Sequence, residues 1–250
     1  MAEAVTPDLC VIGAGSAGLS AAGLAGAFGV PCVLVERARM GGECLNVGCV
    51  PSKALLAAAH AAQSAREAGR FGIEAGPVSV DFPRVMAHVR DVIASIAPTD
   101  SQARFTAIGV RVLRGEAAFT GPKTLAVGDT TIRARRFVLA SGSRPLIPDI
   151  PGLSGVPYLT NETIFDLDVL PAHLIVLGAG PVGIELAQAF RRLGSRVTVV
   201  GSGPALARID PEIAAHALTA LRAGGVTLPE GTRVTAVRAG ETRGGGGCAG

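Results

Sequence analysis

Apolar and polar residues near the start of the chain follow the order of a strand, a turn, a helix and a second strand. A short apolar run, residues 9–12, leads into a glycine-rich turn, an alanine-rich stretch follows, and a second apolar run, residues 32–35, ends at Glu36. Apolar runs of this length are typical of buried strands, and the longer stretch between them is typical of a helix. This order predicts an α/β fold with a parallel sheet.

The same order of elements recurs in "HLIVLGAGPVGIELAQAFRRLGSRVTVVG", residues 173–201. Each copy has the spacing Gly-x-Gly-x-x-Gly, and the two sets lie 165 residues apart: Gly13, Gly15 and Gly18, then Gly178, Gly180 and Gly183. In a dinucleotide-binding turn the first glycine allows the bend, the second lets a pyrophosphate approach the backbone, and the third lets the helix pack on the strand. The helix N-terminus also attracts the phosphates. The repeat therefore predicts two dinucleotide sites.

The two copies differ at the end of their second strand. Glu36 closes the first copy, where its carboxylate would accept the ribose hydroxyls of a dinucleotide. The same offset places Gly201 at this position of the second copy, with Arg196 before the strand and Arg208 as the nearest arginine after it. The second site thus lacks an acid that would favour a 2′-hydroxyl over a 2′-phosphate, and the sequence leaves NADH and NADPH open.

Between the copies the chain shows helical patterns and then β patterns. Residues 55–66 favour a helix, and apolar residues recur at helical spacing from Val85 to Ile96. Alternating residues and Gly-Pro and Gly-Asp turn signals follow from Val110. They predict a small β-meander that starts at Val110 and returns to the main sheet at residues 137–140.

The proline-rich stretch "SRPLIPDIPGL" predicts an extended linker, because proline and the residue before it both disfavour helix. We place a domain boundary near Ile150. The expected domains are residues 1–150, with the first glycine turn, and residues 151–250, with the second.

Composition excludes several classes of protein. The 250 residues are 48% hydrophobic, and the net charge of +3 comes without a dense run of one sign, so nucleic acid is not an expected partner. Residues 9–35 carry no charge and are long enough to span a bilayer, but six glycines and Pro31 interrupt them, so no membrane segment is expected. Five cysteines in a chain of this size do not form a secreted disulfide framework, which favours the cytoplasm.

The segment "GGECLNVGCVPSK" places Cys44 and Cys49 five residues apart. On a regular helix their Cα atoms would be about 8.6 Å apart, whereas a disulfide needs less than about 7 Å. If the thiols join, the segment must depart from regular helix, which Gly48 and Pro51 permit or force. The pair could therefore alternate between dithiol and disulfide.

Three interpretations of the thiol pair compete. A zinc site would need two more ligands, and His60 is the only nearby histidine. A static disulfide is disfavoured by a reducing cytoplasm. Redox exchange is favoured because Cys49 lies just before a predicted helix, whose N-terminus would stabilise a thiolate, and because Lys53 adds positive charge. Cys10 and Cys32 lie in apolar strands and are expected to be inert core residues.

Both glycine turns, the thiol segment, "ASGSRP" and "GAGPVGIELAQAF" occur together in one order. Over nearly its whole length the sequence resembles the flavin-dependent disulfide reductases, which include dihydrolipoamide dehydrogenase, glutathione reductase and mercuric reductase. The resemblance implies two Rossmann-like units with parallel sheets and a small β-meander. It also implies FAD in the first unit and NAD(P)H in the second.

The resemblance further implies the path of the electrons and the residues on it. Hydride would pass from NAD(P)H to FAD, and electrons would pass from FAD to the Cys44–Cys49 disulfide and on to a disulfide or metal-ion substrate, which can be a small molecule or a protein. Cys49 would face the flavin, Cys44 would exchange with substrate, and Lys53 would lie near the flavin ring, paired with Glu185. The residues expected to contact the two cofactors are Gly13, Gly15, Ser16, Ala17, Gly18, Glu36, Gly41, Gly42, Glu43, Cys44, Lys53, Ala117, Ser141, Gly142, Ser143, Gly178, Gly180, Pro181, Val182, Gly183, Glu185 and Val234.

The sequence also departs from the family pattern. Pro181 stands where several relatives have a tyrosine that gates the nicotinamide. The family's homodimerisation domain, with its His-Glu acid/base pair, has no counterpart here, nor does the C-terminal cysteine pair of mercuric reductase, so mercury lacks support. We therefore expect loose FAD binding and little disulfide turnover from this chain alone, and the alternative function is that of a non-catalytic nucleotide-binding remnant.

Overall fold

The computed structural model describes residues 3–229 and 231–239. Contacts between Cα atoms divide the chain into two compact units, and each is described by itself. The first unit contains residues 1–51 and 90–145, and the second contains residues 52–89 and 146–250. The domain boundary near Ile150 stays a prediction.

A four-stranded parallel sheet forms the centre of the first unit, in the order β4-β3-β2-β8. Its strands are β2 (Leu9–Ile12), β3 (Cys32–Glu36), β4 (Val110–Arg114) and β8 (Arg136–Leu139). Every residue of β3 is buried, as expected for a strand with both faces of the sheet covered. The predicted strand–helix–strand order is confirmed.

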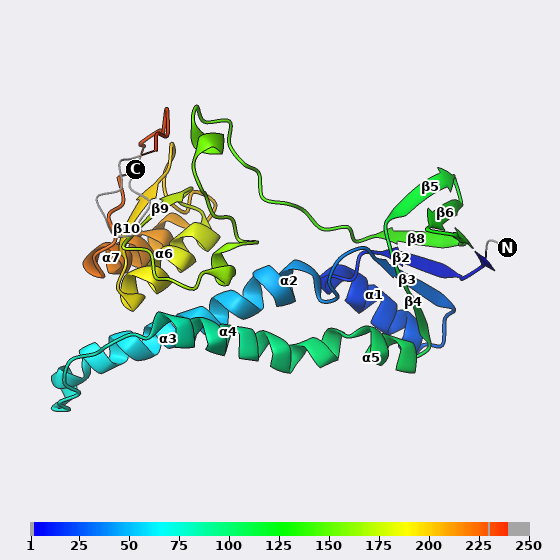
Figure 1. Ribbon diagram of the computed structural model, residues 1–250, viewed down its shortest axis with the longest axis horizontal. Helices are drawn as coiled ribbons and strands as arrows, with labels where there is room; N and C mark the ends of the chain where they lie inside the picture. Colours follow the sequence, from blue (N-terminus) through cyan, green and yellow to red (C-terminus); the bar gives the residue numbers. More distant parts are fainter. Residues whose placement is uncertain (1–2, 230, 240–250) are drawn as a thin grey trace. The chain divides into compact units, whose positions relative to one another are not determined.

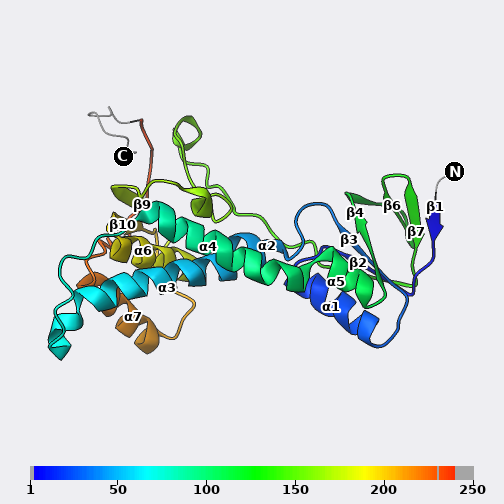
Figure 2. The ribbon, with the colours of Figure 1, turned by 60° about the horizontal axis from the view of Figure 1, so that its bottom comes forward.

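The two faces of this sheet are covered by different elements. Helices α1 (Ser16–Ala27) and α5 (Gln102–Ala107) lie side by side on one face, where Val11 and Leu34 pack with Phe105 (Figures 1 and 2). On the other face Cys10 packs with residues of the meander. Successive residues of β2 thus face opposite sides, as the period of a strand requires.

The predicted meander is confirmed, with one correction. Strands β5 (Ala117–Gly121), β6 (Thr124–Val127) and β7 (Thr130–Arg133) pair antiparallel, and β1 (Glu3–Val5) adds to β7 in parallel, as Figure 2 shows. The prediction that the meander starts at Val110 was wrong. β4 pairs with β3 instead, because Val110 and Val112 are buried against α1 and α5.

The thiol segment and the following stretch are helical. Helix α2 (Gly42–Val47) ends before Gly48, and α3 (Cys49–Arg66), η1 (Ala68–Phe71), α4 (Phe82–Ile96) and η2 (Ala97–Asp100) follow. The two predicted helices are confirmed, and Cys49, which was expected to lie just before the first of them, is itself the first residue of α3. None of the helices in the described part of the chain is both long and apolar enough to cross a membrane.

The second glycine turn lies in the second unit. Strands β9 (His173–Leu177) and β10 (Arg196–Val200) pair in parallel, with α6 (Pro181–Leu193) between them in the chain and α7 (Pro211–Ala223) after them. Short 3-10 turns η3 (Leu153–Gly155) and η4 (Ile164–Asp166) precede β9. Val197, Val199 and Phe190 are fully buried, so α6 and β10 share a core.

Candidate redox and dinucleotide site

The first glycine turn has the geometry that a dinucleotide requires. Gly13 has a φ of +104°, and a Cβ there would lie 2.1 Å from the Ala140 carbonyl oxygen. A Cβ at Gly18 would lie 1.7 Å from the Gly13 oxygen, so α1 packs directly on β2. Gly15 comes just before α1, and a Cβ there would meet only Gly42 within 4 Å. The backbone therefore stays open where the pyrophosphate is expected.

The second turn repeats this geometry. Gly178 has a φ of +113°, and a Cβ at Gly183 would lie 2.3 Å from the Gly178 oxygen. A Cβ at Gly180 would meet no atom within 4 Å. The backbone N–H of Gly178 donates to Val200 over 2.8 Å, as that of Gly13 donates to Val35. Both turns therefore fit a dinucleotide at the start of their helix.

Glu36 holds the first turn together from the end of β3. Its side chain is buried, and its two oxygens accept the backbone N–H groups of Ala14 and Ala38, each over 2.6 Å. A carboxylate can accept about four hydrogen bonds, so two acceptor positions remain for ribose hydroxyls. In the second unit a Cβ at Gly201 would lie 3.6 Å from the Ala179 nitrogen. Gly201 and Ala179 thus repeat the neighbourhood of Glu36 and Ala14 without the acid.

The thiol segment is attached directly to the first glycine turn. The backbone N–H of Gly41 donates to the Ala14 carbonyl over 2.9 Å. Gly42 has a φ of +59°, and a Cβ there would lie 2.5 Å from the Cα of Gly15. The two backbones therefore touch, and they bring the start of α2 against the turn that would hold the pyrophosphate.

The two thiols lie on different helices. Cys44 is a half-buried free thiol on α2, and Cys49 is an exposed residue at the start of α3. The backbone between them breaks at Gly48, which has φ −130° and ψ −114° and would place a Cβ 3.0 Å from the Glu43 oxygen. The predicted departure from regular helix is confirmed. The individual roles of the two thiols stay predictions.

The other cysteines in the described part of the chain have a different environment. Cys10 and Cys32 are buried in β2 and β3. Burial raises the pKa of the Cys10 thiol to about 12, with a further contribution from Cys32, and burial raises the pKa of the Cys32 thiol to about 11. A thiol with such a pKa carries almost no thiolate near neutral pH, which agrees with the expectation that both are inert.

Lys53 and Glu185 form the ion pair that the family resemblance implies. The Lys53 ammonium donates to the Glu185 carboxylate, and both residues belong to the second unit. The side chain of Lys53 is 65% exposed and that of Glu185 is 26% exposed. An ion pair this accessible to water contributes about 0–1 kcal/mol to stability. Its place near a flavin stays a prediction.

The remaining predicted residues lie at or next to the ends of helices and strands, except Val234, which follows α7 outside any element. In the first unit Ser16 and Ala17 begin α1, Ala117 begins β5, and residues 141–143 follow β8. A Cβ added at Gly13 would lie 3.2 Å from the backbone nitrogen of Ser141. Glu43 is exposed on α2. In the second unit Pro181 and Val182 begin α6, and Val234 is half-buried. Their contacts with cofactors stay predictions.

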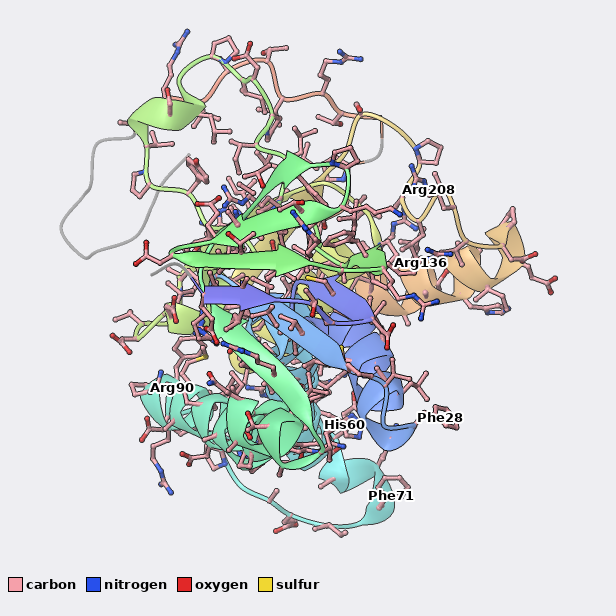
Figure 3. All side chains as sticks on the ribbon, turned by 90° about the vertical axis from the view of Figure 1, so that its right-hand side faces the viewer. Phe28, His60, Phe71, Arg90, Arg136 and Arg208 are labelled. Atoms are coloured by element: carbon pink, nitrogen blue, oxygen red, sulfur yellow. The ribbon has the colours of Figure 1, made fainter. Side chains whose placement is uncertain are left out.

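The zinc interpretation named His60 as the only nearby histidine. His60, labelled in Figure 3, lies on α3 and is exposed. Within residues 3–229 and 231–239, no three His, Cys, Asp or Glu side chains gather in a group that could hold a metal ion.

Sequence reasoning missed two residues of these turns. The Asn46 amide donates to the carbonyls of Met40 and Gly42 beside the thiols. Leu206 has a φ of +55°, and its N–H donates to Ala179 as the N–H of Gly41 donates to Ala14. The 165-residue offset relates Leu206 to Gly41 and could have identified it. No comparable pattern marked Asn46.

Comparison with known proteins identifies the family. The family model described as pyridine nucleotide-disulphide oxidoreductase matches residues 7–245. The chain belongs to the pyridine nucleotide-disulphide oxidoreductases. It is 41% identical over 240 residues to a mercuric reductase of Streptomyces lividans, covering 92% of this chain, and 34% identical over 225 residues to a mercuric reductase of Bacillus cereus, covering 90%.

The fold also matches solved structures of this family. The HOCl-induced flavoprotein disulfide reductase RclA from Escherichia coli superposes with a TM-score of 0.79 at 28% identity, covering 94% of this chain and 51% of that one. Its Cu(II) complex gives a TM-score of 0.77, also at 28% identity, covering 91% of this chain and 50% of that one. The predicted α/β fold with two Rossmann-like units is confirmed. The chain spans 50% of the Streptomyces protein and 36% of the Bacillus protein.

Proposed function

We propose that this chain is the FAD- and NAD(P)H-binding part of an NAD(P)H:disulfide oxidoreductase that uses Cys44 and Cys49 as its redox pair. The observation that carries the proposal is the direct attachment of the thiol segment to the first glycine turn. The Gly41 N–H bonds to Ala14, and Gly42 packs on Gly15. A dinucleotide held at this turn would therefore begin beside the segment that carries the thiols.

Residues of the first unit would hold FAD through backbone groups and one acid. The open backbone at Gly15 and the N-terminus of α1 suit the pyrophosphate, and Glu36 suits the adenosine ribose. In the second unit the turn around Gly180 suits the pyrophosphate of NAD(P)H. When bound, FAD would accept two electrons from NAD(P)H and supply them for reduction of the Cys44–Cys49 disulfide.

The thiol pair would then reduce a substrate disulfide in two exchanges. The Cys44 thiolate attacks one substrate sulfur, a mixed disulfide forms, and the other substrate sulfur leaves as a thiolate that takes up a proton. The Cys49 thiolate attacks the Cys44 sulfur, the intramolecular disulfide forms, and the second substrate thiol is released. The start of α3 suits Cys49 for this step, because a helix N-terminus stabilises a thiolate.

The proposed substrate is a small-molecule or protein disulfide, with a soft metal ion as the second candidate. Relatives named mercuric reductases, and a relative solved with Cu(II), favour the metal ion as an alternative electron acceptor. Thiolates are the preferred protein ligands of soft metals, so the same cysteines suit both substrates. Exchangeable thiols also suit the reducing cytoplasm. The family resemblance further implies a homodimer.

A flavin spectrum tests the proposal. The purified chain is incubated with FAD, freed of excess cofactor, and titrated with NADH or NADPH. A yellow protein whose flavin absorbance falls on titration supports the proposal. A colourless protein, or bound flavin that neither nucleotide reduces, would favour the non-catalytic remnant.

Two cysteine variants test the assignment of the thiols in the flavin-loaded chain. We expect Cys49→Ser to abolish the long-wavelength absorbance between thiolate and flavin in the two-electron-reduced protein. Cys44→Ser should keep or enhance it, because Cys49 then remains as the thiolate beside the flavin. Identical spectra from the two variants would contradict the assignment.

A further inference from the structure

Asn46 makes two hydrogen bonds beside the thiol pair. It lies on α2, two residues after Cys44, and it is half-buried. Its side-chain amide nitrogen donates to the Met40 carbonyl over 2.9 Å and to the Gly42 carbonyl over 2.8 Å. Both N–H groups of the amide therefore have partners in the protein backbone.

The bond to Met40 joins the short helix to the turn before it, and the bond to Gly42 lies at the first residue of the helix. Met40 and Gly42 flank Gly41, whose N–H bonds to Ala14 of the glycine turn. The six residues of α2 are far fewer than the roughly 12–15 that an isolated helix needs, so contacts outside the helix must hold it. Asn46 supplies one such contact, its bond to Met40, and its bond to Gly42 fastens the first residue of α2. Leu45, which is 3% exposed, supplies an apolar contact.

The position of Cys44 relative to Cys49 depends on this attachment. The chain leaves regular helix at Gly48, so α2 and α3 are not one rigid rod. The orientation of α2 is then determined mainly by what anchors its start. A disulfide tolerates only a narrow range of Cα and Cβ separations, and a small rotation of α2 would change how readily the two sulfurs meet.

We propose that Asn46 is a positioning residue for the redox pair: its amide clamps the 40–42 turn to α2 and so holds Cys44 where it can join Cys49. The inference rests on the proposed function, since it assumes that the two thiols form a disulfide. Asn46 is not a catalytic residue, because both of its N–H groups are bonded to backbone carbonyls.

The experiment measures the stability of the disulfide without flavin or nicotinamide. The full 250-residue chain is equilibrated in buffers with graded ratios of reduced and oxidised glutathione. Oxidation forms the Cys44–Cys49 bond and releases two molecules of reduced glutathione from one of oxidised glutathione, so atoms and electrons balance. Acid quenching, alkylation and peptide mapping then quantify this pair separately from the other cysteines.

Asn46→Ala and Asn46→Leu remove both hydrogen bonds, and leucine keeps the branching of the side chain at Cγ. We expect each to lower the equilibrium constant for disulfide formation at least about tenfold, which raises the reduction potential by about 30 mV. The matched control is Gln63→Ala on α3, which also loses a side-chain amide bond, in this case 2.6 Å to Glu67. Its constant should equal that of the unchanged chain.

A fall of less than about tenfold in the constants of both Asn46 variants would overturn the inference. So would unfolding of both variants, as seen by circular dichroism, because Asn46 would then serve the fold alone. If the unchanged chain forms no Cys44–Cys49 disulfide at any glutathione ratio, the proposed function fails. A disulfide that forms but is indifferent to Asn46 refutes only the positioning role.

Discussion

The contact between Gly42 and Gly15 is the feature of the site most open to a quantitative test. In Gly42→Ala the new Cβ would lie 2.5 Å from the Cα of Gly15, on a backbone with a φ of +59°. Carbon atoms normally approach to about 3.5–4.0 Å, so the two segments would have to separate by about 1 Å. This separation would move the start of α2 away from the glycine turn.

The change in the free energy of unfolding has two destabilising contributions and one that offsets them. A left-handed conformation costs a residue other than glycine about 1–2 kcal/mol, and overpacking costs about 1–3 kcal/mol. Loss of glycine's freedom in the unfolded chain returns about 0.4–1 kcal/mol. We therefore expect Gly42→Ala to lower the free energy of unfolding by about 2–4 kcal/mol.

Gly29→Ala is the matched control. Gly29 also has a positive φ, +65°, in the first unit, but a Cβ there would meet no atom within 4 Å. It has the conformational cost without the collision, so we expect a loss of about 1 kcal/mol or less. Urea unfolding followed by circular dichroism measures both variants. Equal losses would show that the contact with Gly15 does not constrain α2, and the reasoning behind the site would fail.

Three further predictions follow from the structure. In the native chain Cys10 and Cys32 should resist iodoacetamide at pH 8 while Cys44 is alkylated, as peptide mapping would reveal. Burial raises the pKa of Cys10 from 9.0 to about 12, so the unfolded state loses this proton at a lower pH than the folded state does. For this reason the free energy of unfolding should fall as the pH rises above about 9. The unchanged chain should discriminate between NADH and NADPH by less than about a hundredfold in kcat/KM, which corresponds to about 2.8 kcal/mol. Gly201→Glu should shift the ratio of the two kcat/KM values at least about tenfold towards NADH. An unchanged ratio would refute the equivalence of Gly201 and Glu36. Lys53→Met should change the free energy of unfolding by no more than about 1 kcal/mol, and a larger loss in urea would mean that the ion pair is shielded from water.

Local pattern was enough to predict the two glycine turns, their helices and strands, and the break between Cys44 and Cys49. In each case the decisive chemistry lies in a few neighbouring residues, such as the glycines that collide with backbone if a Cβ is added. Pairing between distant strands was harder. Val110 begins a strand of the parallel sheet and not of the meander, because burial against helices decides its partner, and this burial leaves no local signal.

Hydrogen bonds from side chains to backbone groups also could not be predicted from the spacing of residues along the sequence. Asn46 looks like any polar residue on a short helix until the turn before it is known to present the carbonyls of Met40 and Gly42. The strand at residues 3–5 is too short for an alternating pattern to emerge. These features depend on three-dimensional neighbours and not on spacing along the chain.

The 165-residue offset allows the two glycine-turn copies within the chain to be compared position by position. Gly41 and Leu206 occupy equivalent places, each with a positive φ and each donating to the alanine of its glycine turn. Where two copies keep a backbone hydrogen bond but change the side chain, the bond belongs to the architecture and the side chain is free to serve the ligand. By this test, substitutions meant to change which nucleotide a unit binds should be made at Glu36 and Gly201. Ala14 and Ala179 should be kept, because their carbonyls accept the backbone bonds that both copies share.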